Sequence, residues 1–260
     1  MVEELAVIIL TKNNFKYIKQ CLDSFNIDAN VCFYIGDTGS TEDVISEMEQ
    51  YFKKSSKKIK LACFKYYNFA KNNNYIAKNL LGDEKYILFC NDDIVINEFN
   101  YDKALELLDR ETTGTVGVKL LFENNTIQHA GQMINIEGDL SLGHILYKQP
   151  DVQIPTQIVR GNTGAFCFIR RDNFNTVGGF NQQYTTCFED VELNLQMLLL
   201  DKCNILIGDC KCYHYESVSR NREETYINIT DYHRLNKFIN QNRRKLNAIF
   251  QNYEQTREIN

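Results

Sequence analysis

The sequence contains no tryptophan, only two prolines, and no apolar run near the roughly 18 residues that a membrane-spanning helix needs. Its amino terminus, MVEELAVIIL, has two acidic residues and no basic segment before an apolar stretch, so it does not resemble a signal peptide. The nine cysteines form no CxxC pair, which favours free thiols in a reducing compartment over a disulfide framework. These absences predict a cytoplasmic protein without a membrane span.

An excess of basic charge and the common phosphate-binding motifs are also missing. The net charge is -5 and the pI is near 5.5, which argues against nucleic-acid binding, because that needs clustered Lys and Arg. The sequence has neither the GxGxxG fingerprint of dinucleotide-binding domains nor the GxxxxGKS/T of a P-loop. A phosphate-bearing ligand would therefore have to be held in another way.

Strands and helices alternate from the amino terminus to about residue 90. Apolar runs predict strands at Leu5–Leu10, Val31–Ile35, Lys57–Phe64 and Tyr86–Cys90. Helical spacing and start signals predict helices at Phe15–Phe25, Thr41–Phe52 and Phe69–Leu80. This order is typical of βαβ units, so we predict an α/β fold with a parallel sheet. Right-handed crossovers would bring three loops to one sheet edge, as in a nucleotide site: Thr11–Asn14, Asp37–Ser40 and Asn91–Asp93.

The stretch YILFCNDDIV, residues 86–95, carries the main chemical signal. An apolar run leads directly into Asn91, Asp92 and Asp93 at a predicted strand end. Strand alternation would point Asn91 and Asp93 to one side and Asp92 to the other. Two oxygen donors on one side suit a hard divalent cation that also holds a diphosphate. The alternative is an acidic turn without a ligand.

The pattern becomes less regular after Asp93. We predict a helix at Tyr101–Leu108, strands of a mixed sheet at Thr115–Phe122, Thr126–Ile136 and Ile158–Ile169, a helix at Val191–Leu200, and short strands at Asn204–Ile207 and Lys211–Tyr215. The polar segment Gly138–Pro155 holds both prolines, and we expect it to be a mobile loop. From about Arg222 the pattern is helical.

Seven motifs in a fixed order resemble glycosyltransferase family 2 of the GT-A fold, in particular its rhamnosyltransferase-like branch. They are AVIILTKNN, YIGDTGSTED, FAKNNNYIAKN, YILFCNDDIVI, VGVKLLFENNTIQHAG, the long run from VRGNTGAF to VELNLQM, and YHYESVSR. The resemblance implies a Rossmann-like, mostly parallel central sheet flanked by helices, with a small mixed sheet and a helical C-terminal extension. It places a GT-A domain at 1–220, divided into a nucleotide-binding half (1–96) and an acceptor and catalytic half (97–220), and the extension at 221–260.

The resemblance also assigns residues to a nucleotide sugar and a metal. It places Asp37 on the base or ribose, with Thr11 and Asn13 lining the same pocket and Asn73 on the nucleotide side. The Asn91-Asp92-Asp93 stretch matches the family's DxD motif, with Asn91 and Asp92 at the nucleotide sugar and Asp93 as the main ligand of Mn²⁺ or Mg²⁺. His214 matches a family His that completes the metal shell in some members; hydrogen bonding alone is the alternative. Arg220, beside Ser219, matches a loop that closes over the diphosphate.

The catalytic assignments follow from the ED motif. The resemblance makes Asp190 the base that takes the acceptor proton, Glu189 its supporting neighbour, and Glu192 a contact for the acceptor. The alternative for Glu189 and Asp190 is N-terminal helix capping, which is compatible with catalysis.

The implied activity is metal-dependent, inverting transfer from a UDP, dTDP or GDP sugar to a glycan or lipid-linked acceptor. Two other functions fit parts of the sequence: a sugar nucleotidyltransferase, for which the first loop lacks the Gly-rich basic character, and a non-catalytic sugar-nucleotide-binding module. Cys210, Cys212 and His214 alternate as zinc ligands could, but core cysteines fit better. The C-terminal helix carries basic residues that could contact a membrane surface, or it packs on the domain with a solvated charged face.

Overall fold

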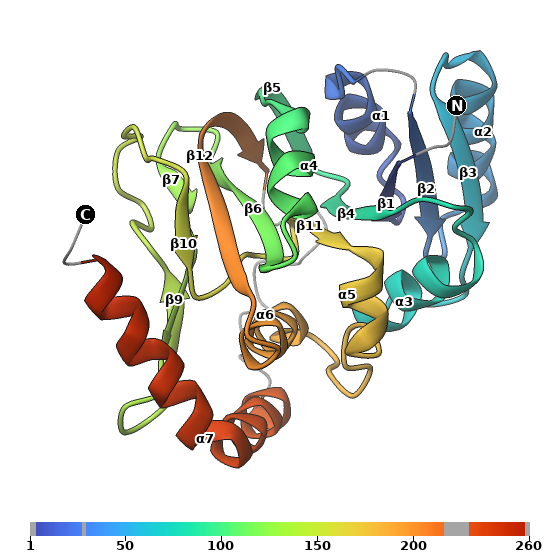
Figure 1. The fold of residues 1–260 in the computed structure, drawn as a ribbon. Helices are drawn as coiled ribbons and strands as arrows, with labels where there is room; N and C mark the ends of the chain where they lie inside the picture. Colours follow the sequence, from blue (N-terminus) through green and yellow to red (C-terminus); the bar gives the residue numbers. More distant parts are fainter. Residues whose placement is uncertain (1–3, 28–29, 216–228, 258–260) are drawn as a thin grey trace.

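A ten-stranded sheet runs through the described part of the chain, residues 4–27, 30–215 and 229–257 of a computed structural model (Figure 1). Its order is β10-β12-β6-β11-β4-β1-β2-β3, with β5 paired to β12 and β7 paired to β6. A separate sheet consists of β8 and β9. The predicted α/β class, with a central sheet, a small second sheet and a C-terminal helix, is confirmed.

The amino-terminal half of the sheet is parallel, as its continuous apolar runs predict. It contains β1 (Leu5–Thr11), β2 (Val31–Asp37), β3 (Lys58–Cys63) and β4 (Tyr86–Asn91). Every residue of β1 and β2 is buried, whereas the edge strand β3 is partly exposed. Thr11 pairs with Asp37 and Leu10 with Asn91, so the three predicted loops do leave the sheet at one edge.

Helices cover both faces of this sheet, because each strand sends alternate apolar side chains to opposite sides. One face packs against α1 (Phe15–Ser24), α2 (Glu42–Lys54) and α4 (Tyr101–Asp109). The other packs against α3 (Phe69–Asn79), α5 (Arg171–Thr176) and α6 (Glu189–Leu199). The second group therefore brings α6 onto the same layer as α3 (Figure 1).

The second half of the sheet mixes parallel and antiparallel pairs. It contains β5 (Ile94–Glu98), β6 (Thr113–Leu121), β7 (Ile127–His129), β10 (Gln157–Val159), β11 (Phe166–Arg170) and β12 (Cys203–His214). Strand β11 lies antiparallel between β4 and β6 and joins the two halves. The predicted domain boundary between residues 96 and 97 falls within β5, and the one between 220 and 221 lies outside the described residues.

Several predicted elements differ from the structure. The expected strand Thr126–Ile136 is divided into β7 and β8 (Gln132–Asn135), and the expected loop Gly138–Pro155 contains β9 (Ser141–His144), which pairs with β8. The expected strands Asn204–Ile207 and Lys211–Tyr215 are one strand, β12, with a bulge between Ile207 and Cys212. Strand β5 was not predicted. These strands are short or irregular, and tertiary pairing decides them.

The expected strand Ile158–Ile169 is also divided, since residues 160–165 leave the sheet between β10 and β11. Two glycines let this segment lie close to neighbouring side chains. A Cβ on Gly161 would lie 2.3 Å from Gln132 Oε1, and one on Gly164 would lie 3.3 Å from Asp190 Cβ. The break therefore brings backbone N–H groups against the start of α6.

A buried polar network fixes α6 against the sheet. The Asn194 amide of α6 donates to the Asn162 carbonyl (2.7 Å), and its oxygen accepts from Thr115 Oγ1 (2.7 Å) and from the Asn162 N–H (3.1 Å). Asn204 adds bonds to Thr115 and to the Asn194 carbonyl. Because removing one partner of a buried pair leaves an unsatisfied group, such a network holds a helix in a defined position.

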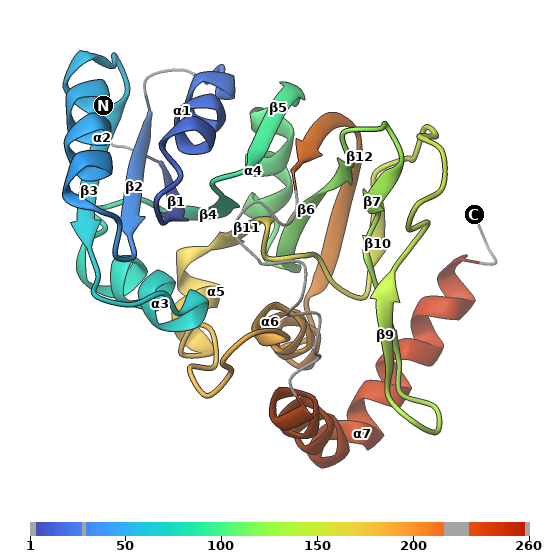
Figure 2. The same cartoon turned by 180° about the vertical axis from the view of Figure 1, so that it is seen from behind.

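The helix α7 (Ile229–Arg257) packs its apolar stripe on α6 and the β8–β9 hairpin (Figure 2). Leu235, Ile239, Leu246 and Phe250 are buried there, and the Tyr232 hydroxyl donates to the Leu140 carbonyl (2.9 Å). The stripe is thus used for packing within the molecule. Among the described residues no helix is long and apolar enough to cross a membrane.

Candidate active site

The turn between β4 and β5 presents the Asn91-Asp92-Asp93 side chains in two directions. On one side, Asp92 Oδ2 accepts hydrogen bonds from Thr11 Oγ1 (2.7 Å) and Asn14 Nδ2 (3.0 Å). Burial and the neighbouring Asp93 charge raise the pKa of Asp92 to about 6, against the opposing effect of these two bonds. Asp92 therefore ties the first and third loops together.

On the other side, Asn91 and Asp93 meet His214 at the end of β12. Asp93 Oδ1 and Asn91 Nδ2 each lie 3.2 Å from His214 Nε2. Gln128 Oε1 lies 2.6 Å from His214 Nδ1, and since an amide oxygen only accepts, the imidazole proton is on Nδ1. In the neutral ring, His214 Nε2 then carries a lone pair, which accepts a hydrogen bond from Asn91 Nδ2.

This arrangement fits a cation. Asp93 Oδ1 is buried, accepts no hydrogen bond from the residues that the structure describes, and lies 3.2 Å from His214 Nε2. Two electron-pair donors at this distance repel each other unless a positive charge, which is either a proton on Nε2 or a bound cation, lies between them. Within the described residues no group of three or more His, Cys, Asp or Glu is placed to hold a metal ion.

Three residues that are predicted to contact the nucleotide lie at the ends of β1 and β2 or in the loop after β1: Thr11, Asn13 and Asp37. The Asp37 carboxylate accepts from the backbone N–H groups of Gly39 (3.1 Å) and Ser40 (3.2 Å). Asn13, at φ 51°, accepts from the Thr41 N–H (2.8 Å), while its own N–H donates to Ser40 Oγ (2.7 Å). Asn73 is buried on α3. Thr11, Asn13 and Asp37 thus lie on joined loops, and their contact with a nucleotide remains a prediction.

The predicted base, Asp190, lies in the first turn of α6. Its Oδ2 accepts from the Gly164 N–H (2.8 Å) and from Gln132 Nε2 (3.2 Å), and its Oδ1 accepts from the Val191 N–H (2.7 Å). Burial raises the pKa of Asp190, and the two backbone hydrogen bonds oppose that rise. A carboxylate with a raised pKa at a helix N-terminus is suited to accept a proton near neutral pH.

The residue before this turn is strained. Phe188 caps α6 with φ 77°, a left-handed conformation that is unfavourable for an aromatic residue. This bend places Glu189, which is buried, and Asp190 in succession at the helix start. Strain of this kind is common at functional sites, and sequence reasoning did not predict it.

Gln132 is a site residue that the sequence did not indicate, and it yields a test. Its amide stabilises the ionised form of Asp190, so Gln132→Leu should raise the Asp190 pKa further. We expect the acid limb of the kcat–pH profile to move to higher pH, because a base with a higher pKa is protonated over more of the acid range. The exposed neighbour Met133 provides the control, Met133→Ala. An unmoved acid limb would show that this bond does not tune Asp190.

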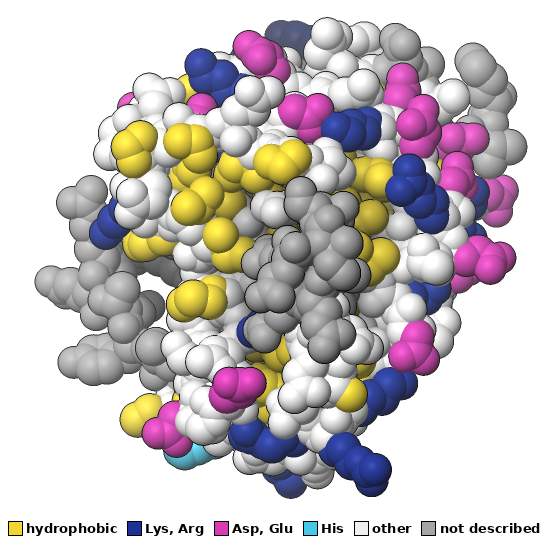
Figure 3. Space-filling model, turned by 60° about the vertical axis from the view of Figure 1, so that its left-hand side comes forward, with side chains coloured by type: hydrophobic (Ala, Val, Ile, Leu, Met, Phe, Trp, Pro, Cys, Tyr) yellow, Lys and Arg dark blue, Asp and Glu magenta, His cyan; other side chains and the backbone are white. Residues whose placement is uncertain are grey.

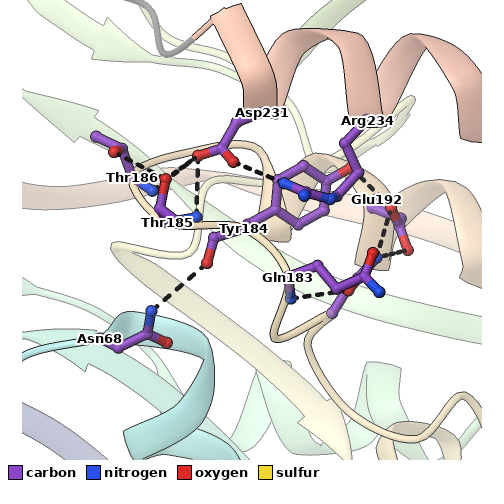
Figure 4. A network of polar contacts seen from close by, with 9 residues as sticks. Asn68, Gln183, Tyr184, Thr185, Thr186, Glu192, Asp231 and Arg234 are labelled. Carbon is purple, nitrogen blue, oxygen red and sulfur yellow. Dashed lines mark hydrogen bonds and ion pairs between the residues drawn. The ribbon is translucent and has the colours of Figure 1, made fainter.

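Glu192, assigned to the acceptor, is 4% exposed and already bonded inside the protein. It accepts from Tyr184 Oη (2.7 Å), Asn181 Nδ2 (3.0 Å) and Gln196 Nε2 (3.2 Å). Figure 4 shows Glu192 beside the loop that leads into α6. Asp231 holds the same loop, because its carboxylate accepts from the N–H groups of Thr185 and Thr186. These contacts fix the loop before Asp190, and acceptor contact by Glu192 remains a prediction. Arg220 and Ser219 lie outside the described residues.

The zinc reading finds no support in the contacts of the two cysteines. Cys210 Sγ donates to the backbone carbonyls of Ile207 and Lys119, and Cys212 is fully buried in the core. All nine cysteines lie in the described ranges, and none is in a disulfide.

Comparisons with known proteins identify the fold and the family. The sequence model of glycosyl transferase family 2 matches residues 6–178. The O-antigen biosynthesis protein RfbC of Myxococcus xanthus is 27% identical over 230 residues, which are 84% of this chain and 18% of that protein. The chain therefore spans less than a fifth of this curated relative.

Two solved structures share the fold at low identity. The mannosyltransferase PcManGT of Pyrobaculum calidifontis, in complex with GDP-Man and Mn²⁺, superposes with a TM-score of 0.59 at 14% identity, covering 82% of this chain and 57% of that one. TarS of S. aureus, residues 1–349 with UDP-GlcNAc, gives a TM-score of 0.63 at 16% identity, covering 89% and 64%. At these identities they establish the GT-A fold alone.

Proposed function

The chain belongs to glycosyl transferase family 2, and we propose that it transfers a sugar from a nucleotide-diphosphate donor to a hydroxyl group, with inversion. The observation that carries the proposal is the Asp93–His214 pair, whose facing electron-pair donors match a cation that would neutralise a diphosphate. The placement of Asp190 at the start of α6 adds a base.

In the proposed reaction, Asp190 is the general base. Its carboxylate takes the proton of the acceptor hydroxyl while the acceptor oxygen attacks the anomeric carbon. The bond from that carbon to the diphosphate breaks, and the diphosphate leaves with the electron pair. A single base acting opposite the leaving group supports inversion. Gly164, Gln132 and Val191 orient the carboxylate, and Glu189 is its supporting neighbour.

Asp93 and His214 are the residues that would hold Mn²⁺ or Mg²⁺. A bound cation supplies Lewis-acid stabilisation of the charge that develops on the departing diphosphate. Gln128 accepts from Nδ1–H, which sets the tautomer whose Nε2 would face the cation, in the way that outer-shell partners orient metal-binding histidines.

For the substrates, we propose a UDP, dTDP or GDP sugar as donor, held by Thr11, Asn13, Asp37, Asn73, Asn91 and Asp92, with Arg220 as a clamp. The acceptor is a glycan or a lipid-linked glycan of polysaccharide biosynthesis, with Glu192 near it. Hydrophobic side chains gather on the face shown in Figure 3. Val152 and Ile158 are about half exposed, which suits an acceptor with an apolar portion. Peripheral membrane contact through α7 would rest on its basic residues.

A thermal-shift screen tests the function. UDP-, GDP- and dTDP-sugars are each added with and without Mn²⁺ or Mg²⁺, because a ligand of the folded state stabilises it, by about 2.7 kcal/mol at a hundredfold excess over Kd. We expect a metal-dependent rise in Tm with one nucleotide class. The absence of any rise would contradict the proposal.

A further inference from the structure

A buried histidine, His129, and an exposed one, His144, form a hydrogen-bonded pair outside the catalytic set. His129 Nδ1 of β7 lies 2.8 Å from His144 Nδ1 of β9. Two imidazole nitrogens at this distance share one proton, so one of them donates and the other accepts. The pair connects the main sheet with the β8–β9 hairpin.

The contacts of His129 decide where the protons lie. Its Nε2 accepts the Thr163 N–H (3.3 Å), so in the neutral ring the proton is on Nδ1 and is donated to His144. Burial, with His144 and His214 nearby, lowers the pKa of His129 well below its usual value, which keeps the ring neutral. His144 accepts at Nδ1 and, when neutral, carries its own proton on Nε2.

The pair lines a cavity of about 160 Å³, several times the ~30 Å³ that one water occupies in the liquid. The lining residues are Gln128, His129, His144, Tyr147, Thr163 and His214. Within the described part of the chain this lining has no Lys, Arg, Asp or Glu. Amide, hydroxyl and neutral imidazole groups beside an aromatic ring suit a neutral, hydroxyl-rich ligand better than an anion.

The walls of the cavity lead to both parts of the active site. His214 contacts Asp93 on one side. On the other side Thr163, which holds His129, precedes Gly164, which holds Asp190. In addition, His144 is the cross-strand partner of Gln132, which donates to Asp190. The cavity is therefore connected to the cation pair and to the base by direct contacts.

We propose that this cavity binds a sugar ring, and that the His129–His144 pair fixes its hydrogen-bonding pattern and makes His144 a specificity-determining residue. The ring belongs to the donor or to the acceptor of the transfer reaction, so the inference rests on the proposed function. Locked tautomers give a site one defined arrangement of donors and acceptors, and an unmatched sugar hydroxyl is then rejected.

The tautomers of His129 and His144 are tested by NMR of the full chain, in which the histidine rings are labelled with ¹⁵N. The sequence has only four histidines, so single substitutions assign each imidazole, with the surface residue His233 as reference. We expect the Nδ1–H form for His129 and the Nε2–H form for His144. An Nε2–H form of His129, or rapid exchange between forms at both residues, would overturn the locked pair whatever the enzyme does.

Ligand additions test the sugar. UDP-GlcNAc, GDP-mannose, the nucleoside diphosphates alone, and free GlcNAc, mannose or rhamnose are added with Mg²⁺, which is diamagnetic and leaves the imidazole signals visible. If the ring is the donor's, a sugar nucleotide shifts the His129 and His144 signals and its nucleoside diphosphate does not. If it is the acceptor's, a free sugar added with the diphosphate shifts them. If no saturating sugar ligand shifts the His129 and His144 signals, the proposal is overturned. If only the proposed function is wrong, the His214 signal does not shift when a nucleotide is added.

Variants complete the test. His144→Leu should weaken the responding sugar ligand about 10-fold, the scale of one or two lost hydrogen bonds, and leave nucleoside diphosphate affinity within about twofold. His144→Asn keeps an acceptor for His129 and should lose less affinity. Met133→Ala, on the same hairpin and 48% exposed, should change neither. Equal sugar affinity in His144→Leu and the wild type would contradict a role in specificity.

Discussion

Asp190→Asn should lower turnover by at least about 10²-fold while the nucleotide sugar still binds, because the variant has no carboxylate to take the acceptor proton. The structure adds a second reason. Among the described residues, the three groups that hydrogen-bond the carboxylate are all donors: the N–H groups of Gly164 and Val191, and the amide of Gln132. An asparagine amide nitrogen would face a donor in either orientation, so the side chain would also lose its fixed position.

Controls separate the lost base from a lost fold. Thermal unfolding and nucleotide-sugar affinity of Asp190→Asn should be measured beside turnover, and Asp190→Ala removes the side chain without placing donor against donor. Asp201→Asn changes an exposed carboxylate just beyond the other end of α6 and should behave as the wild type. Turnover of Asp190→Asn or Asp190→Ala close to the wild-type rate would remove Asp190 from the base position.

Local sequence pattern predicted the amino-terminal half of the fold because those strands are buried on both faces. A short continuous apolar run such as residues 86–90 is typical of a strand buried on both faces. The loops that follow parallel strands must then leave the sheet at one edge. The two directions of Asn91 and Asp92 also followed from strand alternation, since Asn91 faces His214 while Asp92 faces Thr11.

The parts that sequence reasoning missed depend on contacts between distant segments. Strands β8 and β9 are four residues each and carry no apolar run of their own, so only their pairing makes them strands. Gln132, Gln128 and the His129–His144 pair are polar residues whose roles come from the partners that the fold brings to them. The helical period predicted the packed stripe of α7, but not its neighbours on α6 and the hairpin.

Asp93→Asn should abolish the dependence of nucleotide-sugar binding on Mn²⁺ or Mg²⁺ and at the same time stabilise the ligand-free protein. In the wild type Asp93 Oδ1 is a buried, unsatisfied acceptor that faces the His214 Nε2 lone pair. An asparagine at this place replaces the carboxylate by a neutral amide whose nitrogen can face Nε2 as a donor, which removes both the unsatisfied acceptor and the repulsion. An unsatisfied buried group costs about 1–3 kcal/mol, so we expect a gain in the free energy of unfolding of about 1 kcal/mol.

Asp93→Asn is expected to lower the metal dependence of nucleotide-sugar binding and to raise the free energy of unfolding, so a general loss of structure cannot produce both results. Unfolding in denaturant gives the stability of both proteins without metal, and calorimetric titration gives nucleotide-sugar affinity with and without Mn²⁺. His214→Ala serves as the partner variant; it removes one of the two facing groups, so it should lower metal dependence less than Asp93→Asn. A variant that keeps the wild-type response to Mn²⁺ would exclude Asp93 as a cation ligand. Lower stability of metal-free Asp93→Asn would show that the facing lone pairs do not destabilise the ligand-free site, and the structural case for a cation between Asp93 and His214 would fail with it.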